Sequence, residues 1–600
     1  MKQIRLHITK AVAAAFLVAG LFACNEDKGN YDYSEIGVVA SFSRIDNSYT
    51  RVLTDSLIIR PGVAFDTLQY PEVNEADFTY TWKIEQGSGD NGALKLLHEG
   101  RNLEIVIDTP IFQINRSYKL VYEVVNKTTN IPYRKIFTVT TENLFQRGFV
   151  ALSQKTDGLE LDVVSFYRNK FTLYTDVLES MDSELPRNAT PWDIVTYDDR
   201  LAPDPMHIET DYSLFILTDQ YTTRLMPTNY SWKPSYDISN IIEKDSYLDT
   251  AFVQKGKPVI AKQLRYSYIQ SASIMQPRVL MYHQESAEEA NWYLYITFPQ
   301  YSANAVQMNR FRDVSNNGAL NGAVRYNAAP FVSMTRFNLM YYNMDNNVFV
   351  SGSLPVTDGQ GGDFGTRKFY YADAFVRPGG IGENPGSAGF KFTDDMTGLL
   401  YMDDQQGSGL YHLANYAIRK LPDGTLQYIQ WNVNNTANGQ TTTALMNNTK
   451  QRSSKFATNS RVVDAKFFAR PPLANNMWLY YVTNDNRVYK ANIGSANVAE
   501  EDITDTFVKD GYNEITVFKY TRPESNSVPD VANALAVATY NATNGLDSGG
   551  KVEFFLPVSG VDNGNLEVAK YPKPLDEDDV YQTMSFTGLG KVAGLTYKKR

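Results

Sequence analysis

Apolar and polar residues alternate with a period of two along the first part of this chain. The segments that show this pattern, or short apolar runs of strand length, are 78–84, 103–107, 117–125 and 133–139. Such alternation is typical of strands that bury one face, and the polar segments between them are typical of turns. Residues 36–142 are therefore expected to form a β-sandwich of the immunoglobulin-like kind, with Trp82 as its core anchor.

From residue 148 onward, pairs of apolar runs flank turns rich in Asp, Asn, Gly and Pro. The turns lie at 157–158, 219, 299, 345–347, 407, 485–486 and 544–545. Their spacing of roughly 45 to 80 residues corresponds to blade-sized repeats with insertions. We expect an all-β chain in which residues 148–600 form a seven-bladed β-propeller, with 591–597 pairing beside 148–153 to join its ends. The alternative is two packed β-sandwiches whose hairpins are similar by coincidence.

The first residues have the pattern of a secretory leader. Residues 1–10 carry three positive charges and precede an apolar stretch, 11–22, that is too short to span a bilayer. The run LFAC ending at Cys24 resembles a bacterial lipobox, in which the cysteine becomes the mature N-terminus and carries acyl chains, although Phe22 departs from the usual small residue. We expect a lipoprotein signal peptide over 1–23, lipidation at Cys24 and a polar tether over 24–35. An ordinary buried cysteine is the alternative.

The location expected from these residues is the outer membrane, facing the cell exterior. Glu26 and Asp27 directly follow Cys24, and acidic residues at this place resemble the surface-export signal of Bacteroidetes lipoproteins. Contact with the membrane is then expected only through the lipid anchor.

Charge and cysteine content exclude several classes of function. The chain has 57 Lys and Arg against 67 Asp and Glu, a net charge of −10. Nucleic-acid binding is not expected, because phosphate contacts require clustered cations. Cys24 is the single cysteine, so a disulfide within the chain and cysteine-based metal sites are excluded.

The sequence contains no motif of a metalloprotease, a serine-nucleophile hydrolase or a phosphate loop. Glycoside hydrolysis needs only two carboxylates at a set separation. The acids considered for it are Asp198, Asp199, Asp394, Asp395, Asp403 and Asp404. No cofactor is expected. The turns 343–347 and 484–486 offer oxygen ligands for a structural calcium ion, although Asn and Asp in turns are also explained by hydrogen bonds to the backbone.

Aromatic residues are the main indication of a binding surface. Flat rings stack on the apolar faces of sugars and also line peptide pockets. The candidates, all expected in loops between strands, are Tyr370, Tyr371, Trp431, Trp192, Tyr230 and Trp232. In a chain with 13% aromatic residues, core packing is the alternative role for each of them.

Several of these segments together resemble the PKD-like family of Bacteroidetes lipoproteins. The resemblance rests on the lipobox, the run DKGNYDY at 27–33, the strand around 80–82 and the junction RGFVALS at 147–153, and it covers about residues 20–165. It implies association with SusC/SusD-type, TonB-dependent uptake systems as an accessory surface binder. The family offers no catalytic motif to match.

The function expected is capture of a glycan or peptide nutrient, without catalysis, for an outer-membrane transporter. A propeller glycoside hydrolase or lyase is one alternative, and a structural or adhesive surface protein is another.

Overall fold

A computed structural model describes the chain between residues 38 and 598. The gaps in this description are 53–54, 87–92, 109–110, 114–115, 143, 146, 168–169, 199–211, 227–228, 242–259, 272–273, 285–289, 298–305, 311–326, 335–338, 345–346, 353–395, 407–411, 432, 435–444, 447–451, 473–476, 522–532, 559–562 and 573–579. The chain divides into two compact units, Met1–Asn143 and Leu144–Arg600, which are described separately.

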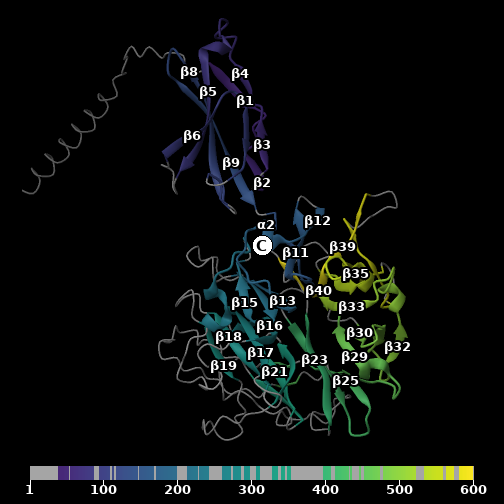
Figure 1. The fold of residues 1–600 in the computed structure, drawn as a ribbon. Coiled ribbons are helices and arrows are strands. Elements are labelled where there is room, and N and C mark those ends of the chain that lie inside the picture. The colour runs from purple at the N-terminus through teal and green to yellow at the C-terminus, as the bar shows by residue number, and fades with distance from the viewer. Residues whose placement is uncertain are drawn as a thin grey trace, which may run out of the picture. The chain divides into compact units, whose positions relative to one another are not determined.

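In its described residues, the first unit consists of strands in three sheets (Figure 1). A five-stranded sheet has the order β2-β9-β8-β5-β6, and two-stranded sheets are formed by β1 with β4 and by β3 with β7. The bounds are β1 (Val39–Ser43), β2 (Ser48–Val52), β3 (Ser56–Ile59), β4 (Gly62–Phe65), η1 (Glu75–Asp77), β5 (Phe78–Gln86), β6 (Ala93–Glu99), β7 (Leu103–Val106), β8 (Ser117–Asn126) and β9 (Pro132–Glu142). All four strand segments expected from the alternation are present.

Trp82 lies at the centre of the core of this unit. Its side chain is fully buried, and its ring centroid is 4.3 Å from that of Tyr122 and 6.0 Å from that of Phe137. Its indole Nε1 donates to the Gly100 carbonyl at 3.0 Å, which satisfies the one polar atom of the ring. Leu57 of β3 and Leu103 of β7 close the core from the other layer. The predicted sandwich and its tryptophan anchor are confirmed.

The second unit contains seven antiparallel sheets of three or more strands in its described part, which we number in chain order. The first has the order β12-β11-β10-β40, and the others follow the chain. The strands of the first four sheets are β10 (Gly148–Lys155), β11 (Gly158–Tyr167), β12 (Lys170–Tyr174), β40 (Lys591–Lys598); β13 (Pro191–Asp198), β14 (Tyr212–Thr218), β15 (Thr222–Leu225); β16 (Ala261–Ser271), β17 (Ile274–Gln284), β18 (Ala290–Thr297), β19 (Val306–Arg310); β20 (Ala328–Met334), β21 (Leu339–Asn343) and β22 (Val348–Gly352).

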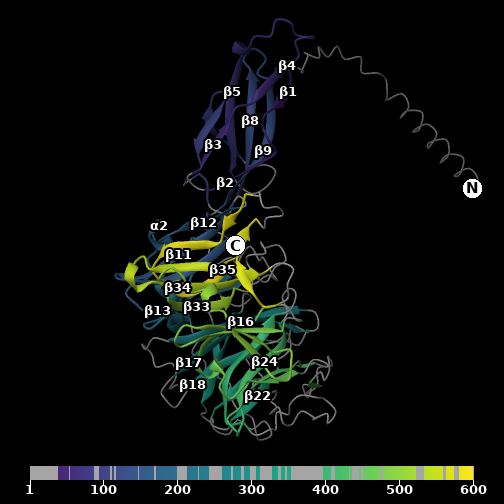
Figure 2. The ribbon, with the colours of Figure 1, turned by 90° about the vertical axis from the view of Figure 1, so that its right-hand side faces the viewer.

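The last three sheets have the same form. Figure 2 shows β33 and β34 of the seventh sheet beside each other in green and yellow. The strands are β23 (Gly398–Gln406), β24 (His412–Lys420), β25 (Leu426–Trp431), β28 (Arg452–Lys455); β29 (Ala465–Ala469), β30 (Trp478–Thr483), β31 (Val488–Asn492), β32 (Ala499–Asp502); β33 (Glu514–Tyr520), β34 (Leu535–Tyr540), β35 (Gly550–Pro557), β36 (Leu566–Val568) and β39 (Ser585–Leu589), which also pairs with β35.

Short elements complete the described part of this unit. They are the two-stranded pairs β26 (Val433–Asn434) with β27 (Leu445–Met446) and β37 (Lys570–Tyr571) with β38 (Gln582–Thr583), and the helices α2 (Val177–Ser180), η2 (Pro234–Tyr236), α3 (Ile238–Ile241), η6 (Arg461–Asp464), η7 (Thr504–Thr506) and η9 (Ala542–Asn544). None of the helices in the described part of the chain has the length and apolar composition that crossing a bilayer requires.

All seven predicted hairpins are present, and each lies in a different sheet. In chain order they are β10–β11, β14–β15, β18–β19, β21–β22, β23–β24, β30–β31 and β34–β35. Asn347 and Asn486 have positive φ angles of 52° and 63°. Asparagine tolerates this conformation well, which explains why Asp-Asn runs identified the turns in the sequence.

The final strand pairs with the first strand of the unit. β40 runs antiparallel to β10, with Phe149 opposite Tyr597 and Ala151 opposite Leu595. The pairing predicted between 148–153 and 591–597 is therefore confirmed. The two strands contribute to one apolar cluster with strands of the seventh sheet, in which the Phe149 and Phe554 ring centroids are 3.9 Å apart.

Candidate functional site

Polar side chains from the third, fifth and sixth sheets gather in one place. We call the group the Asp403 cluster; its members are Arg265, Tyr401, Asp403, Tyr416, Tyr428, Gln430 and Arg470. Asp403 lies in β23, and only 4% of it is exposed. Its Oδ1 is 3.4 Å from Nη2 of Arg265 in β16 and also accepts from the Asp404 backbone N–H at 2.9 Å. Its Oδ2 accepts from the Tyr401 hydroxyl at 2.9 Å.

Charge pairing controls the state of Arg265. Burial acts to lower the pKa of the guanidinium, but the Asp403 carboxylate, with further contributions from Tyr401 and Asp404, raises that pKa above its usual value. Arg265 therefore stays charged, and its side chain keeps 31% of its surface exposed. It is the most accessible cation of the cluster.

Arg470 brings a second guanidinium, which is 2% exposed and directly follows β29. Its Nη1 donates to the Tyr428 hydroxyl at 2.6 Å, and that hydroxyl donates to Oε1 of Gln430 at 3.2 Å. The guanidinium also lies over the rings of Tyr416 and Tyr428, at 5.3 and 5.7 Å from the centroids. Burial raises the pKa of Tyr428 to about 12, so this phenol remains a neutral donor at physiological pH.

The arrangement suits hydrogen bonding to a polar ligand better than acid–base chemistry. Asp403 and Asp404 are neighbours in a strand, so their side chains lie on opposite faces of the sheet. Asp404 is opposite Asn415, whose Oδ1 accepts from Ser333 at 2.6 Å, whereas Asp403 is opposite Tyr416. The two carboxylates therefore cannot flank one glycosidic bond as the acid–base pair of a hydrolase does.

The roles of the remaining acids considered for catalysis stay predictions. Asp199, Asp394 and Asp395 lie outside the described residues, and of Asp198 only its place in β13 is described.

Two of the aromatic candidates are core residues. Trp431 is the last residue of β25 and is fully buried in a cluster with Met402 and Ile429. Tyr230 is also fully buried, and its hydroxyl donates to the Phe145 carbonyl at 3.1 Å. The predicted loop position of Trp431 is wrong, because β25 continues through it. Neither ring offers a face to a ligand, because both pack inside the unit.

Trp192 and Trp232 are half-buried and hydrogen-bonded. Trp192 lies in β13, not in a loop, and its Nε1 donates to the Ala261 carbonyl at 3.1 Å. The Lys262 ammonium lies 4.0 Å from the centre of its ring. Trp232 follows β15 and donates to Oγ1 of Thr223 at 2.8 Å. Both indoles hold neighbouring segments of the chain together.

Three other predicted residues, Tyr370, Tyr371 and Cys24, lie outside the described residues, so their roles stay predictions.

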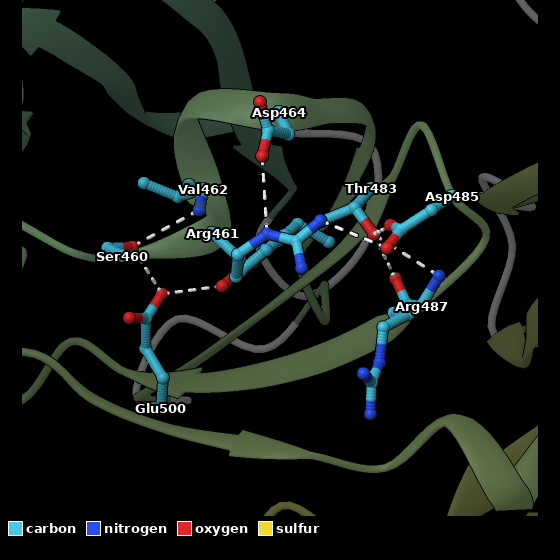
Figure 3. A network of polar contacts seen from close by, with 9 residues as sticks. Ser460, Arg461, Val462, Asp464, Thr483, Asp485, Arg487 and Glu500 are labelled. Atoms are coloured by element: carbon cyan, nitrogen blue, oxygen red, sulfur yellow. Dashed lines mark hydrogen bonds and ion pairs between the residues drawn. The ribbon is translucent and has the colours of Figure 1, made fainter.

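One of the turns considered for calcium is held by cations of the protein itself. Figure 3 shows Arg461 between Asp464 and Asp485, with Nε 3.2 Å and Nη2 3.0 Å from their carboxylates. Asn486 Oδ1 accepts from Lys466 Nζ at 2.6 Å. Since an arginine and a lysine occupy these oxygens, a calcium ion is disfavoured there. No group of three or more potential metal ligands is present among the described residues, and positions 345–346 of the other turn are outside them.

Arg265 and Arg470 were not predicted from the sequence. Neither lies in a motif, and more than 130 residues separate Arg265 from Asp403. The available signal was charge within otherwise apolar strands, as in the FFAR run that ends at Arg470. Asp403 was among the acids considered for glycoside hydrolysis, but it was not predicted as a ligand-binding residue.

Comparison with solved structures gives only distant likenesses. A quinonprotein alcohol dehydrogenase-like protein from Bacteroides thetaiotaomicron is 10% identical over 93% of this chain and 98% of its own, with a TM-score of 0.31. A DUF4784 family protein from Bacteroides caccae is 8% identical over 78% and 96%, with a TM-score of 0.28. The β-propeller domain of Cps50 from Myceliophteria thermophila is 10% identical over 66% and 93%, with a TM-score of 0.32. At such TM-scores these likenesses transfer neither ligand nor activity to this chain.

Comparison by sequence identifies one region. No curated protein matches the chain. The family model of the PKD-like family matches residues 24–185, which include the sandwich and the first strands of the second unit. This agrees with the resemblance seen in the sequence over about residues 20–165, and it shows that the N-terminal part of the chain is similar to that family.

Proposed function

We propose that the second unit is a seven-bladed β-propeller in which each of the seven sheets is one blade. The contacts between neighbouring sheets support this. Contacts join β40 to β13, β13 to β16, β16 to β20, β20 to β23, β29 to β33 and β33 to β40. The fifth and sixth sheets share an apolar cluster that includes Tyr416 and Leu479. This order visits each sheet once and returns to the first, as blades around an axis do.

We propose that this unit binds a polar ligand, an oligosaccharide or a peptide, without converting it. The Asp403 cluster carries the proposal. It combines a carboxylate, two guanidiniums and tyrosine hydroxyls from the third, fifth and sixth sheets, and Arg265 is accessible at its edge. Such groups hydrogen-bond to hydroxyl and amide groups, and the ring faces add stacking area. A hydrolase is the weaker alternative, because the two adjacent carboxylates are on opposite faces.

The proposed location is the outer membrane, with the chain anchored through acylated Cys24 and facing the exterior. In this proposal the PKD-like unit is a spacer and the ligand is passed to a SusC/SusD-type transporter. The leader, the lipobox and the acidic residues after Cys24 support the anchor.

Changing Cys24 tests the anchor. We expect Cys24→Ser to lose acyl labelling and to leave the membrane fraction, because a single polypeptide without acyl chains has nothing to hold it there. Protease added to intact cells should degrade the parent chain but spare a periplasmic marker. A variant that remains membrane-bound, or a parent chain that is protected from protease, contradicts this part of the proposal.

Changing Asp403 tests the binding site. The purified full chain is screened against arrays of glycans and peptides, and the dissociation constant of the best binder is measured for Asp403→Asn and Tyr401→Phe. We expect the dissociation constant to rise tenfold or more in Asp403→Asn. The rise should be smaller in Tyr401→Phe, because this variant removes one donor to the Asp403 carboxylate but keeps the aromatic ring. Asp505→Asn, at an exposed acid of η7, is the control.

Three outcomes contradict the proposal. They are turnover of the bound ligand, unchanged affinity in Asp403→Asn, and equal weakening in the Asp505 control. The unfolding temperature of each variant shows whether a loss of affinity reflects misfolding.

A further inference from the structure

Arg224 of β15 is a nearly buried cation that has no acceptor among the residues that the structure describes. Only 4% of its surface is exposed. Its Nε is shielded from solvent and has no hydrogen-bond partner, and in the described structure no ion pair reaches its guanidinium. Its one side-chain contact of note is aromatic: Cζ lies 4.9 Å from the centre of the Tyr236 ring. A buried donor without an acceptor costs stability, so such a group commonly has a functional reason.

Other buried arginines of the same unit do have acceptors. Arg419 donates from Nε to Oε1 of Gln427 at 2.9 Å, and Arg470 donates to the Tyr428 hydroxyl. Arg224 therefore differs from these two arginines because its side chain forms no hydrogen bond to a described residue.

The acid that bridges to β15 lies on the other face of the sheet. Asp237 forms an antiparallel bridge with Thr223, so its side chain lies on the face of Thr223, opposite to that of Arg224. Its Oδ1 accepts from the Ser239 backbone N–H at 2.8 Å, and burial raises its pKa. This carboxyl is thus unsuited to neutralise Arg224.

A second cation shares the Tyr236 ring. Nζ of Lys233 lies 4.7 Å from the ring centre, and Tyr236 itself is 4% exposed. The backbone N–H of Tyr236 donates to the Lys233 carbonyl at 2.8 Å, which fixes the turn of η2 that carries both residues. The Tyr236 ring therefore contacts both a guanidinium and an ammonium.

We propose that Arg224, positioned by Tyr236 and assisted by Lys233, is a recognition site for a peptide carboxylate. The parallel N–H groups of a guanidinium match the two oxygens of a carboxylate. The small exposed part of Arg224 admits a carboxylate on a slender arm, such as a peptide C-terminus or an acidic side chain, better than one fixed directly to a sugar ring. The net charge of −10 disfavours multiply charged anions.

This inference rests on the proposed function for the kind of ligand and narrows it from glycan or peptide to an acidic peptide. Binding to the full chain is measured by calorimetry with N-acetyl-triglycine and its C-terminal amide, which differ by one charge. We expect the acid to bind at least tenfold more tightly than the amide. Arg224→Met should abolish that difference, and Arg224→Lys should leave part of it. Arg51→Met is the matched control, because Arg51 also lies over a tyrosine ring, 5.7 Å from the Tyr49 centroid, in the other unit.

Stability without ligand separates recognition from a structural role. We expect Arg224→Met to keep or raise the unfolding temperature, because the group removed has no hydrogen-bond partner. A fall of several degrees would assign Arg224 to packing and overturn the proposal. Equal affinity for N-acetyl-triglycine and its amide overturns the proposal as well. So does a preference for galacturonate over its methyl ester when neither of the two peptides binds.

Different experimental outcomes would contradict this inference and the proposed function. If a neutral oligosaccharide binds through Asp403 while Arg224→Met changes nothing, the proposed function stands and this inference fails. If the acid-over-amide preference depends on Arg224 but Asp403→Asn has no effect on affinity, the Asp403 cluster is not the binding site and the Arg224 site stands.

Discussion

At the scale of single residues, Asp162 is an acid that is buried without an ion pair to any described residue. It is fully buried in β11, where its Oδ2 accepts from Ser153 Oγ at 3.0 Å and its Oδ1 accepts from the Asp176 backbone N–H at 3.2 Å. Burial, followed by the hydrogen bond to Glu160 and its charge, raises the pKa of Asp162 well above the usual value. Glu160 in turn pairs with Lys155 at 2.5 Å. The two carboxyl groups therefore favour sharing a proton.

This raised pKa predicts a pH dependence of stability. Folding favours the protonated form of Asp162, so its contribution is complete below the pKa of the unfolded chain and is lost as pH rises through the higher folded pKa. We expect Asp162→Asn to increase the free energy of unfolding of the second unit at neutral pH by about 1–2 kcal/mol. The gain should shrink toward pH 4. Denaturant titrations between pH 4 and 8 measure it, and a variant that is less stable at every pH contradicts the prediction.

At the scale of elements, β40 fits closely against β13. A Cβ atom added at Gly594 would lie 2.6 Å from the Ile194 backbone N and 2.7 Å from the Asp193 Cα, so no side chain fits there. Thr196 Oγ1 and Thr596 Oγ1 are 2.8 Å apart across the same two strands. Lys519 of β33 pairs with Asp193 of β13 at 2.9 Å, so two of the strands that contact β40 are also joined to each other.

A single methyl group should test this contact. We expect Gly594→Ala to destabilise the second unit by about 1–3 kcal/mol, because the backbone of β13 must move to accommodate it. Gly398→Ala is the matched control, since Gly398 is also in a strand and has open space at its Cβ position. Thermal unfolding of the two variants gives the comparison, and equal stabilities would show that β13 and β40 are further apart than described.

The elements also show what the sequence could predict. The seven hairpins were predictable because a turn and its two strands are adjacent in the chain, and Asn486 marks its turn by residue type alone. The approach of Arg265 to Asp403 was not, because it depends on how separate sheets pack. Trp431 was misplaced because the Asn- and Thr-rich run that follows it resembles a loop, whereas its burial comes from packing against other strands.

At the scale of the whole molecule, two separate cores predict two unfolding events. The core around Trp82 belongs to the first unit, and the clusters built on strands from β10 onward belong to the second. Each core is expected to unfold cooperatively as its own transition.

Truncating Trp82 should separate the two events. We expect Trp82→Ala to destabilise the first unit by about 3–5 kcal/mol, because it leaves a large cavity and an unpaired Gly100 carbonyl. Differential scanning calorimetry of the full chain should then show one transition moved to lower temperature and the other unchanged. In Gly594→Ala, the transition of the second unit should move to lower temperature and that of the first unit should stay unchanged. A common shift of both transitions in either variant would contradict independent folding.

The pairing of β10 with β40 has a consequence for biosynthesis. Roughly 430 residues separate the two strands in the chain. At typical translation rates, about 20–90 seconds pass between their syntheses. During that interval one edge of β10 lacks its native partner strand. Such an unpaired edge can form hydrogen bonds with other chains, which leads to aggregation. We therefore expect the yield of folded chain to depend on chaperones that shield this edge until the last strand is available to pair with it.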